Sequence, residues 1–359
     1  TLIETQLVET VVLNLINFES LIATKAARIR QAAGDRLLMD FGLRRAHGYG
    51  GIQASRSAII GGFQKTSNTF SAAKYGLEPS GTMAHSWIQS FDDEITAFRT
   101  YAELYSEQCI LLVDTYDTVN SGLPNAIRVG LDMEEQGLKL KGIRIDSGDL
   151  ACLSKKARKM LDMAGLDYVR IIVSNQLDEH IISSLLNQEA PIDGFGVGTA
   201  LATGKGSGAL DGVYKLSMIE ELPTLKISEN TGKITLPGKK TVYRFLDENG
   251  LFRADAITLE NESEIRTISH PFEYGTRTKI SKNKKEKLIQ SVMEQGKVFD
   301  RISNAYEIAE YTQERLRQLP AEHKRLVFPQ TYEVGISSAL LRLRDHLKKQ
   351  TTGYTVLST

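Results

Sequence analysis

The stretch GIRIDSGDL at residues 142–150 joins a short apolar segment, a polar turn and the start of a helical pattern. The apolar segment spans Gly142–Ile145, and DSGD at 146–149 supplies side chains typical of turns and helix caps. From Leu150 to Ala164 the apolar residues recur at helical spacing. A strand that passes through a polar turn into a helix is the repeating unit of parallel β/α folds.

The same alternation recurs along the middle of the chain, so the sequence predicts an α/β fold with a parallel sheet. Further short apolar segments lie at Arg36–Gly42, Cys109–Asp114, Tyr168–Ser174 and Gly194–Gly198. Helical patterns between them cover Ala84–Glu107, Leu123–Glu135 and Asp178–Leu186. The pattern alone leaves open whether the sheet closes into a complete β/α barrel or stays open.

The two ends of the chain differ from this middle region. Residues 4–33 read as one long helix that stops at Gly34. After Asp211, alternating segments separated by Pro and Gly turns predict an antiparallel β unit. These segments are Tyr214–Met218, Thr224–Ser228 and Thr241–Leu246. Charged surface helices are expected at 280–318 and 336–348.

These patterns divide the chain into four expected regions. They are a linking helix at 1–35, an α/β barrel at 36–212, an antiparallel β-rich segment at 213–275 and a C-terminal helical region at 276–359.

Composition narrows the class of protein. The 359 residues are 41% hydrophobic and 25% charged, with a formal net charge of zero, which argues against a surface that coats nucleic acid. A local anion pocket is still allowed, because it needs only a few cations. The two cysteines, Cys109 and Cys152, are not in a zinc-binding pattern and fit a reducing cytosol. We find no signal peptide and no apolar run of about 18 residues, so no membrane span is expected.

Polar side chains follow five of the expected strands, at the strand ends where parallel β/α folds bind ligands. They are Arg44 and Arg45, the DTYD run at 114–117, the DSGD run at 146–149, SNQ at 174–176, and Gly198 with Thr199. Each residue type is also common in caps and turns. Five such ends on one face favour an anionic, hydroxyl-bearing substrate such as a sugar phosphate.

Three segments carry the most chemistry. FGLRR at 41–45, followed by ASR at 54–56 and GGFQKTSN at 61–68, supplies paired arginines that can hold a carboxylate or phosphate. GTMAHSW at 81–87 places His85 at a strand-to-helix turn, although a lone histidine is more often structural than catalytic. RIDSGD at 144–149 sets one cation and two carboxylates within six positions.

Between residues 5 and 348 the chain resembles the nicotinate phosphoribosyltransferase family. The matching motifs, in order, are FGLRRAH (41–47), ASRSAIIGGF (54–63), KTSN (65–68), GTMAHSW (81–87), LLVDTYDT (111–118), GIRIDSGDL (142–150), SNQLDEH (174–180) and FGVGTAL (195–201). The resemblance implies an irregular α/β barrel beside a smaller β-rich domain. It also implies a homodimer with active sites at the subunit interface, and the small number of cysteines favours a cytoplasmic location.

The resemblance further implies a reaction in NAD biosynthesis. Nicotinate attacks C1 of phosphoribosyl pyrophosphate to give nicotinate mononucleotide and pyrophosphate, with Mg²⁺ as cofactor and ATP as co-substrate. ATP hydrolysis is coupled through a phosphorylated histidine, which matches His85. Together with Arg144 and Asp146, His85 is expected to form the catalytic group.

Further roles follow from the same motifs. Phe41 would stack on the pyridine ring, Arg44 and Arg144 would bind anionic groups, and Thr82 would lie beside the substrate. Asp146 would face ribose or metal, and Gly198 with Thr199 would cradle the 5′-phosphate. Asp114 and Asp117 would either orient His85 or take part in metal binding, and no residue is firmly assigned as a metal ligand.

Ser67 bears on the choice of substrate. The related nicotinamide-using enzymes carry an aspartate at the matching position, which would accept from an amide and repel a carboxylate. A neutral serine at position 67 therefore favours nicotinate.

Other readings stay open at this point. They are a nicotinamide or quinolinate phosphoribosyltransferase, or a non-catalytic nucleotide-binding relative. We also expect that the N-terminal region of the family precedes Thr1.

Overall fold

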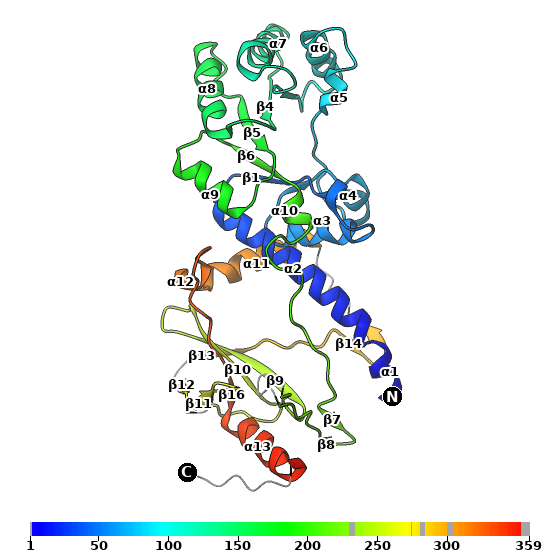
Figure 1. Cartoon of the computed structure of the whole chain (residues 1–359), viewed down its shortest axis with the longest axis vertical. Coiled ribbons are helices and arrows are strands. Elements are labelled where there is room, and N and C mark those ends of the chain that lie inside the picture. The colour runs from blue at the N-terminus through cyan, green and yellow to red at the C-terminus, as the bar shows by residue number, and fades with distance from the viewer. Residues whose placement is uncertain (1, 230–233, 274, 281–283, 300–303, 353–359) are drawn as a thin grey trace. The chain divides into compact units, whose positions relative to one another are not determined.

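The computed structural model describes residues 2–229, 234–273, 275–280, 284–299 and 304–352 (Figure 1). The chain divides into two compact units. The first unit combines residues 1–211 with 303–313, and the second combines 212–302 with 314–359.

The first unit is built on a six-stranded sheet in the order β2-β1-β6-β5-β4-β3, in which every pair of neighbouring strands is parallel. Its strands are β1 Leu37–Asp40, β2 Lys65–Thr66, β3 Ile110–Leu112, β4 Gly142–Ile145, β5 Arg170–Ser174 and β6 Gly194–Val197. The predicted parallel α/β fold is confirmed. Since β2 and β3 are edge strands, the sheet is an open half-barrel in the part of the chain that the structure describes.

Helices α3 to α9 lie between these strands in the chain, as βα alternation requires, while α1 and α2 precede β1 and α10 follows β6. They are α1 Leu2–Leu7, α2 Glu9–Ala33, α3 Gly50–Ile60, α4 Thr69–Tyr75, α5 His85–Ile88, α6 Glu94–Leu104, α7 Leu123–Glu135, α8 Leu150–Met163, α9 Glu179–Asn187 and α10 Thr199–Ala202. A 3₁₀ turn at Leu43–Arg45 and a π-helical turn at Thr118–Gly122 follow β1 and β3. The single helix predicted over 84–107 is instead two helices, because Asp93 caps α6 by accepting from the Thr96 N–H.

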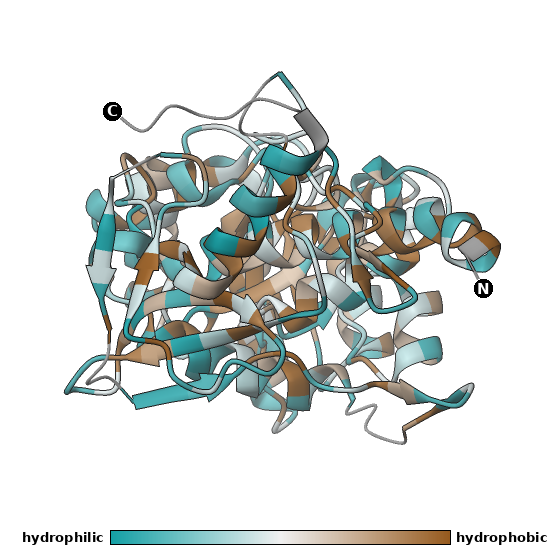
Figure 2. Ribbon diagram, turned by 90° about the horizontal axis from the view of Figure 1, so that it is seen from below, coloured by the Kyte–Doolittle hydropathy of each residue, from teal (hydrophilic) through white to brown (hydrophobic). Residues whose placement is uncertain are grey.

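The core of the first unit lies on both faces of the parallel sheet. Leu38, Leu111, Ile143, Ile171 and Phe195 come from five different strands and are fully buried. Strands buried on both faces are apolar without alternation, which is why short apolar runs marked them in the sequence. In Figure 2, teal and brown alternate along the helices, as expected for helices with one buried side.

The N-terminal helix changes character along its length. From Ile3 to Ala33 it is long and apolar enough to cross a membrane by length and composition, with a mean hydropathy of 1.4 in its best window. The prediction that no segment reaches this length is therefore wrong by that criterion. Only 11% of that window is buried, and both core helices and signal sequences pass the same test. In α2, Ile22 and Ile29 are buried whereas Val11 and Ile16 are exposed. The C-terminal half of α2 packs against α3 and α9.

The second unit contains a mixed sheet in the order β12-β11-β16-β10-β9-β13, in which only β10 and β16 pair in parallel. Its strands are β9 Lys240–Leu246, β10 Phe252–Leu259, β11 Thr267–Ser269, β12 Arg277–Lys279, β13 Lys284–Lys287 and β16 Val334–Ser337. Two short hairpins pair β7 Met218–Ile219 with β8 Leu222–Pro223, and β14 Met293–Glu294 with β15 Lys297–Val298. Helices α12 Ala321–Lys324 and α13 Ser338–Thr352 also belong to this unit, whereas α11 Ala305–Gln318 lies in the first unit as far as Gln313.

Strands do form after residue 211 as predicted, but most of them lie at other positions than expected. The strand expected at 241–246 is β9, whereas 214–217 and 224–228 form no strand. The surface helix expected from residue 280 is wrong as far as residue 299, because β13, β14 and β15 lie there among the described residues. The charge-rich KKEK of β13 misled the prediction, yet charged side chains are typical of an exposed edge strand.

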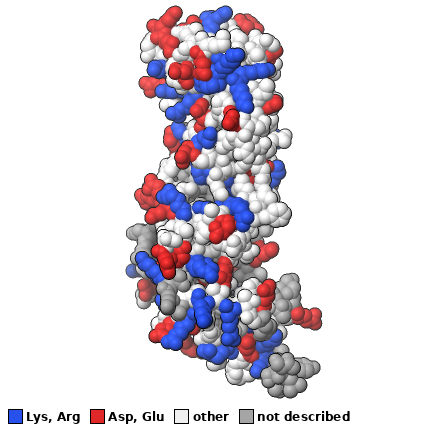
Figure 3. Space-filling model, turned by 90° about the vertical axis from the view of Figure 1, so that its left-hand side faces the viewer, with Lys and Arg blue, Asp and Glu red and all other residues white. Residues whose placement is uncertain are grey.

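Charges of both signs share the molecular surface. The chain holds 44 Lys and Arg and 44 Asp and Glu. On the face drawn in Figure 3, blue and red side chains are interspersed and neither sign forms a continuous track.

Gly122 ends the π-helical turn after β3 and packs against the backbone of Val113. A Cβ on Gly122 would lie 1.8 Å from the Val113 carbonyl oxygen. Only a residue without a side chain permits this approach, which folds the turn back over the end of β3.

We predict that Gly122→Ala lowers the free energy of unfolding by about 3 kcal/mol, because the new methyl group forces backbone to move. Thermal denaturation measures the loss. The control is Gly208→Ala, whose added Cβ would meet nothing within 4 Å. Equal melting temperatures for the two variants would contradict the prediction.

Candidate active site

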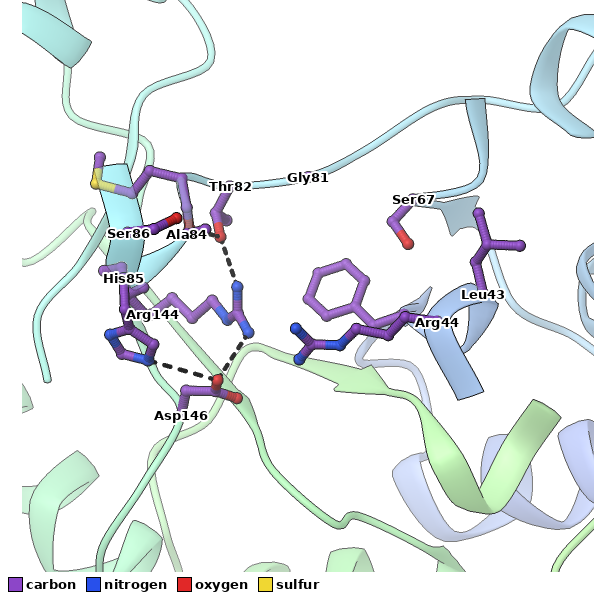
Figure 4. A pocket seen from close by; sticks show the side chains of 13 residues that line it. Leu43, Arg44, Ser67, Gly81, Thr82, Ala84, His85, Ser86, Arg144 and Asp146 are labelled. Atoms are coloured by element: carbon purple, nitrogen blue, oxygen red, sulfur yellow. Dashed lines mark hydrogen bonds and ion pairs between the residues drawn. The ribbon is translucent and has the colours of Figure 1, made fainter. Parts of the chain in front are cut away.

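A cavity of about 740 Å³ opens at the carboxyl ends of the strands in the first unit. Its lining residues are Phe41, Leu43, Arg44, Ser67, Gly81, Thr82, Met83, Ala84, His85, Ser86, Leu112, Arg144 and Asp146. Figure 4 shows the extended segment through Gly81 and Thr82 running along the cavity, from the side of Ser67 to that of His85. The sequence prediction that strand ends form the site is supported by this arrangement.

Arg144 lies at the centre of the cavity and is held by three polar contacts. Its Nε donates to Ser174 Oγ at 2.8 Å, and its Nη1 donates to Thr82 Oγ1 at 2.8 Å. Its Nη2 lies 3.1 Å from Asp146 Oδ2, in an ion pair whose side chains are 12% and 20% exposed. The guanidinium carbon also lies 5.1 Å from the centre of the Phe41 ring, within range of a cation–π contact. Arg144 is therefore fixed in orientation before any ligand binds.

His85 is the first residue of α5 and faces two carboxylates. Its Nε2 lies 3.8 Å from Asp146 Oδ2 and 3.9 Å from Asp114 Oδ1. Its Nδ1 lies 3.1 Å from Thr115 Oγ1, and 41% of the side chain is exposed. His85 and Arg144 thus share one cavity and contact the same carboxylate, so His85 is not a histidine of the core.

Asp114 supports this arrangement from below the cavity surface. Its Oδ2 accepts from the Asp146 backbone N–H at 3.0 Å and from Ser147 Oγ at 2.5 Å. Its Oδ1 is buried without a hydrogen-bond partner and faces His85. Asp114 therefore fixes the turn that carries Asp146 and directs one unsatisfied oxygen at the imidazole.

Asp117 is engaged elsewhere, although the sequence grouped it with Asp114. Its carboxylate accepts from the backbone N–H groups of Val119 and Asn120, at 3.0 and 2.9 Å, and from the Asn120 side chain. The hydrogen bonds from Asn120 and Val119 lower the pKa of this carboxyl group. The structure gives Asp117 the role of a helix cap.

A smaller cavity of about 210 Å³ shares Phe41, Arg44, Arg144 and Asp146 with the first. Its other lining residues are Arg45, Ser174, Asn175, Gln176, Gly196, Gly198 and Thr199. Asn175 and Gln176 have left-handed φ angles of 95° and 45°, a strained backbone that clusters at functional sites. The two cavities together bring every predicted substrate-binding residue to one end of the sheet.

The Phe41 ring lies against the backbone of β6. A Cβ on Gly196 would lie 2.5 Å from two carbons of that ring. Gly196 therefore allows the ring to lie close to the strand and keeps the cavity open. Thr115 and Ser174 were expected only as members of polar strand ends, and Gly196 had no individual role in the sequence, because their contacts are made between distant strands and loops.

These groups suit two kinds of ligand in adjacent positions. Guanidinium groups at Arg44 and Arg144 can pair with carboxylate or phosphate oxygens. An aromatic ring beside them can stack on a flat heterocycle. An imidazole between carboxylates can accept a phosphoryl group.

Comparisons with known proteins agree with this chemistry. The chain matches the nicotinate phosphoribosyltransferase (NAPRTase) family over residues 37–241, and the C-terminal domain of nicotinate phosphoribosyltransferase over 239–344. It is 43% identical over 346 residues to nicotinate phosphoribosyltransferase of Bacillus subtilis, covering 94% of this chain and 70% of that protein. Identity to the enzyme of that name from Caenorhabditis elegans is 36% over 398 residues, covering 93% and 71%.

Solved structures are also similar to most of this chain, and two of them illustrate the likeness. Human nicotinic acid phosphoribosyltransferase has a TM-score of 0.81 at 29% identity, covering 95% of this chain and 77% of that one. Nicotinate-nucleotide pyrophosphorylase from Pyrococcus furiosus has a TM-score of 0.69 at 28% identity, covering 86% and 73%.

We predict that Gly196→Ala weakens binding of a pyridine carboxylate at least about tenfold, because the methyl group pushes the Phe41 ring into the cavity at a cost above about 1.4 kcal/mol. Isothermal titration calorimetry measures the affinity. Gly81→Ala is the matched control, since Gly81 lines the same cavity and an added Cβ would meet nothing within 4 Å. Equal affinities in the two variants would show that Gly196 does not support the ring.

Proposed function

The chain belongs to the nicotinate phosphoribosyltransferase family, and we propose that it joins nicotinate to phosphoribosyl pyrophosphate in a step of NAD biosynthesis. The products are nicotinate mononucleotide and pyrophosphate, and ATP hydrolysis drives the yield through a phosphorylated His85. One observation carries the proposal: His85, Arg144 and Asp146 meet in a cavity that also holds Phe41 and Ser67.

The pyridine needs to be oriented more than activated. Its ring nitrogen has a free lone pair, so attack on C1 of the ribose requires no general base. Stacking on Phe41 would hold the ring plane, while Arg44 or Arg144 would pair with the carboxylate and Ser67 would donate to it. Holding both reactants in this geometry is itself a large part of catalysis.

The leaving pyrophosphate needs fixed positive charge nearby. As the bond to C1 breaks, negative charge grows on pyrophosphate and positive charge grows on the ribose. Arg44 and Arg45 line the second cavity, where they can bind phosphate oxygens, and Gly198 with Thr199 would hold the 5′-phosphate. Asp146 lies at the boundary of the two cavities, where a carboxylate suits the ribose hydroxyls or the positive ribose ring.

The residues present fit Mg²⁺. Asp114 Oδ1 is a buried carboxylate oxygen without a hydrogen-bond partner. It lies 3.9 Å from His85 Nε2, and Asp146 Oδ2 lies 3.8 Å from the same nitrogen. One or two carboxylates together with substrate phosphates is the usual protein environment of this ion. When bound, Mg²⁺ would neutralise charge on the pyrophosphate.

The surroundings of His85 suit a phosphoryl acceptor. Carboxylates on the Nε2 side favour the imidazole tautomer that keeps its proton on Nε2. Nδ1 then carries the lone pair, and the Thr115 hydroxyl can donate to it until a phosphoryl group arrives. The same carboxylates would stabilise the positive charge of the imidazolium formed on phosphorylation.

The other readings have less support. The Bacillus subtilis and Caenorhabditis elegans relatives both bear the name nicotinate phosphoribosyltransferase, which favours nicotinate over nicotinamide or quinolinate. A protein that only binds nucleotides has no use for a histidine set between two carboxylates. We also propose that the enzyme is a homodimer, as the family resemblance implies, and cytoplasmic, as the small number of cysteines favours.

We predict that His85→Ala lowers the rate of ATP hydrolysis by a factor on the order of 10³ or more, because the variant lacks the phosphoryl acceptor. Product formation without ATP should persist, and the ATP-driven gain in yield should vanish. Phosphate release and product yield, each with and without ATP, measure these effects. His180→Ala, an exposed histidine on α9, is the control. Unchanged coupling in the His85 variant would refute the phosphohistidine.

We predict that the wild-type enzyme prefers nicotinate when nicotinate and nicotinamide compete, and that Ser67→Asp reverses the preference. The added carboxylate repels nicotinate and accepts from the amide, which should change the ratio of kcat/KM values by about 10² or more. Chromatography of the two mononucleotide products gives the ratio directly. A wild-type preference for nicotinamide would end the substrate claim.

A further inference from the structure

Asp40 is a buried carboxylate that the proposed reaction does not use. It is the last residue of β1 and is only 4% exposed. Among the described residues no cation is paired with it; three hydrogen bonds from neutral groups satisfy the carboxylate instead. Burying a carboxylate without a cation costs hydration free energy, which hydrogen bonds must offset. An apolar residue would avoid this cost, so the hydrogen bonds of Asp40 suggest a specific structural role.

The three donors come from three different segments. Oδ1 accepts from the Gly42 backbone N–H at 2.8 Å. Oδ2 accepts from Ser55 Oγ on α3 at 2.7 Å and from Thr66 Oγ1 on β2 at 2.8 Å. One carboxylate thus joins the turn after β1, helix α3 and strand β2.

Two of these segments carry residues assigned above to the pyridine. Phe41 lies between Asp40 and Gly42, so the bond to the Gly42 N–H fixes the turn on which the Phe41 ring stands. Ser67 follows Thr66, and its backbone N–H donates to the Asp40 carbonyl at 2.8 Å. Hydrogen bonds to Asp40 therefore position the backbone on both sides of the proposed pyridine site, at Phe41 and at Ser67.

Asn68 closes the network on its far side. Its backbone N–H donates to Thr66 Oγ1 at 3.1 Å, and its side-chain amide donates to Ser55 Oγ at 3.2 Å. Each hydroxyl that donates to Asp40 is thus oriented by a second bond. Ser55, Thr66 and Asn68 are all at most 1% exposed, so the network is sealed from water.

We propose that Asp40 is a positioning residue that sets the spacing between the Phe41 ring and the Ser67 hydroxyl, and thereby the enzyme's selection of a pyridine carboxylate. The inference rests on the proposed function, because it takes Phe41 and Ser67 as the two sides of the pyridine site. Asp40 lines neither cavity, so it acts only through these neighbours.

The test compares Asp40→Asn and Thr66→Val with wild type, using steady-state kinetics on the full chain. Asp40→Asn keeps the shape of the side chain but makes it a weaker acceptor of the three hydrogen bonds. Thr66→Val removes only the hydroxyl that donates to Asp40 Oδ2. Leaving buried donors poorly satisfied should raise KM for nicotinate about tenfold in Asp40→Asn and about threefold in Thr66→Val. KM for phosphoribosyl pyrophosphate should stay within about twofold, and the preference for nicotinate over nicotinamide should fall.

Asp178→Asn is the matched control. Asp178 lies in the same unit, is 7% exposed and accepts two backbone N–H groups and Lys205, but lines neither cavity. A general loss of stability would appear in this variant and in the melting temperatures of all three. We expect its two KM values and its substrate preference to match wild type.

The pattern of KM values decides whether Asp40 positions the pyridine site. A selective rise in the nicotinate KM supports the proposal. A parallel change in both KM values, a loss confined to kcat, or no change overturns it while leaving the proposed function intact. If Asp40→Asn does not fold, Thr66→Val decides alone by the same criteria. A wild-type chain that makes no nicotinate mononucleotide defeats the proposed function, and this inference with it.

Discussion

The ion pair between Arg144 and Asp146 is the contact on which the rest of the site depends. The two residues are two positions apart at the end of β4, and side chains at that spacing along an extended strand lie on the same face. Their 3.1 Å contact is mostly shielded from water, so it is stronger than a surface pair and costly to leave unpaired. Ser174 on β5 donates to Asp146 Oδ1 at 2.5 Å while accepting from Arg144, and so ties the pair to the next strand.

Around that pair the parallel sheet acts as a fixed frame. Residues in or just after all six strands meet at the same edge of the sheet and line the two cavities. Arg144 touches groups from β5 and from the segment before α5, and Asp114 after β3 holds the backbone of Asp146. Rigid elements place the charges before substrate arrives, which is the arrangement that electrostatic catalysis requires.

On the Phe41 side of the cavity, the lack of a side chain at Gly196 matters as much as the hydrogen bonds of Asp40. Gly196 leaves room for the Phe41 ring, and the Asp40 carboxylate holds the turn after that ring from below. Asn175 and Gln176 adopt left-handed backbone angles at the end of β5. Native structures retain such conformations where the surrounding packing enforces them, and here they line the second cavity.

The sequence by itself located five of the six strands in the first unit, because apolar runs and cap residues are local signals; α7 spans Leu123–Glu135 as predicted, whereas β2, α3 and α4 were not expected. It also indicated which strand ends are polar, and the family motifs there named His85, Arg144 and Asp146. It failed where local signals conflict with pairing, as at β13, whose KKEK reads as a helix until β9 pairs with it. Only the tertiary structure separated Asp114, which faces His85, from Asp117, which caps a turn, and only it brought Asp40 to Ser55 and Thr66. The reason is physical: a carboxylate looks the same in the sequence whichever donor it faces, and the donors reach it through contacts 15 and 26 residues away along the chain.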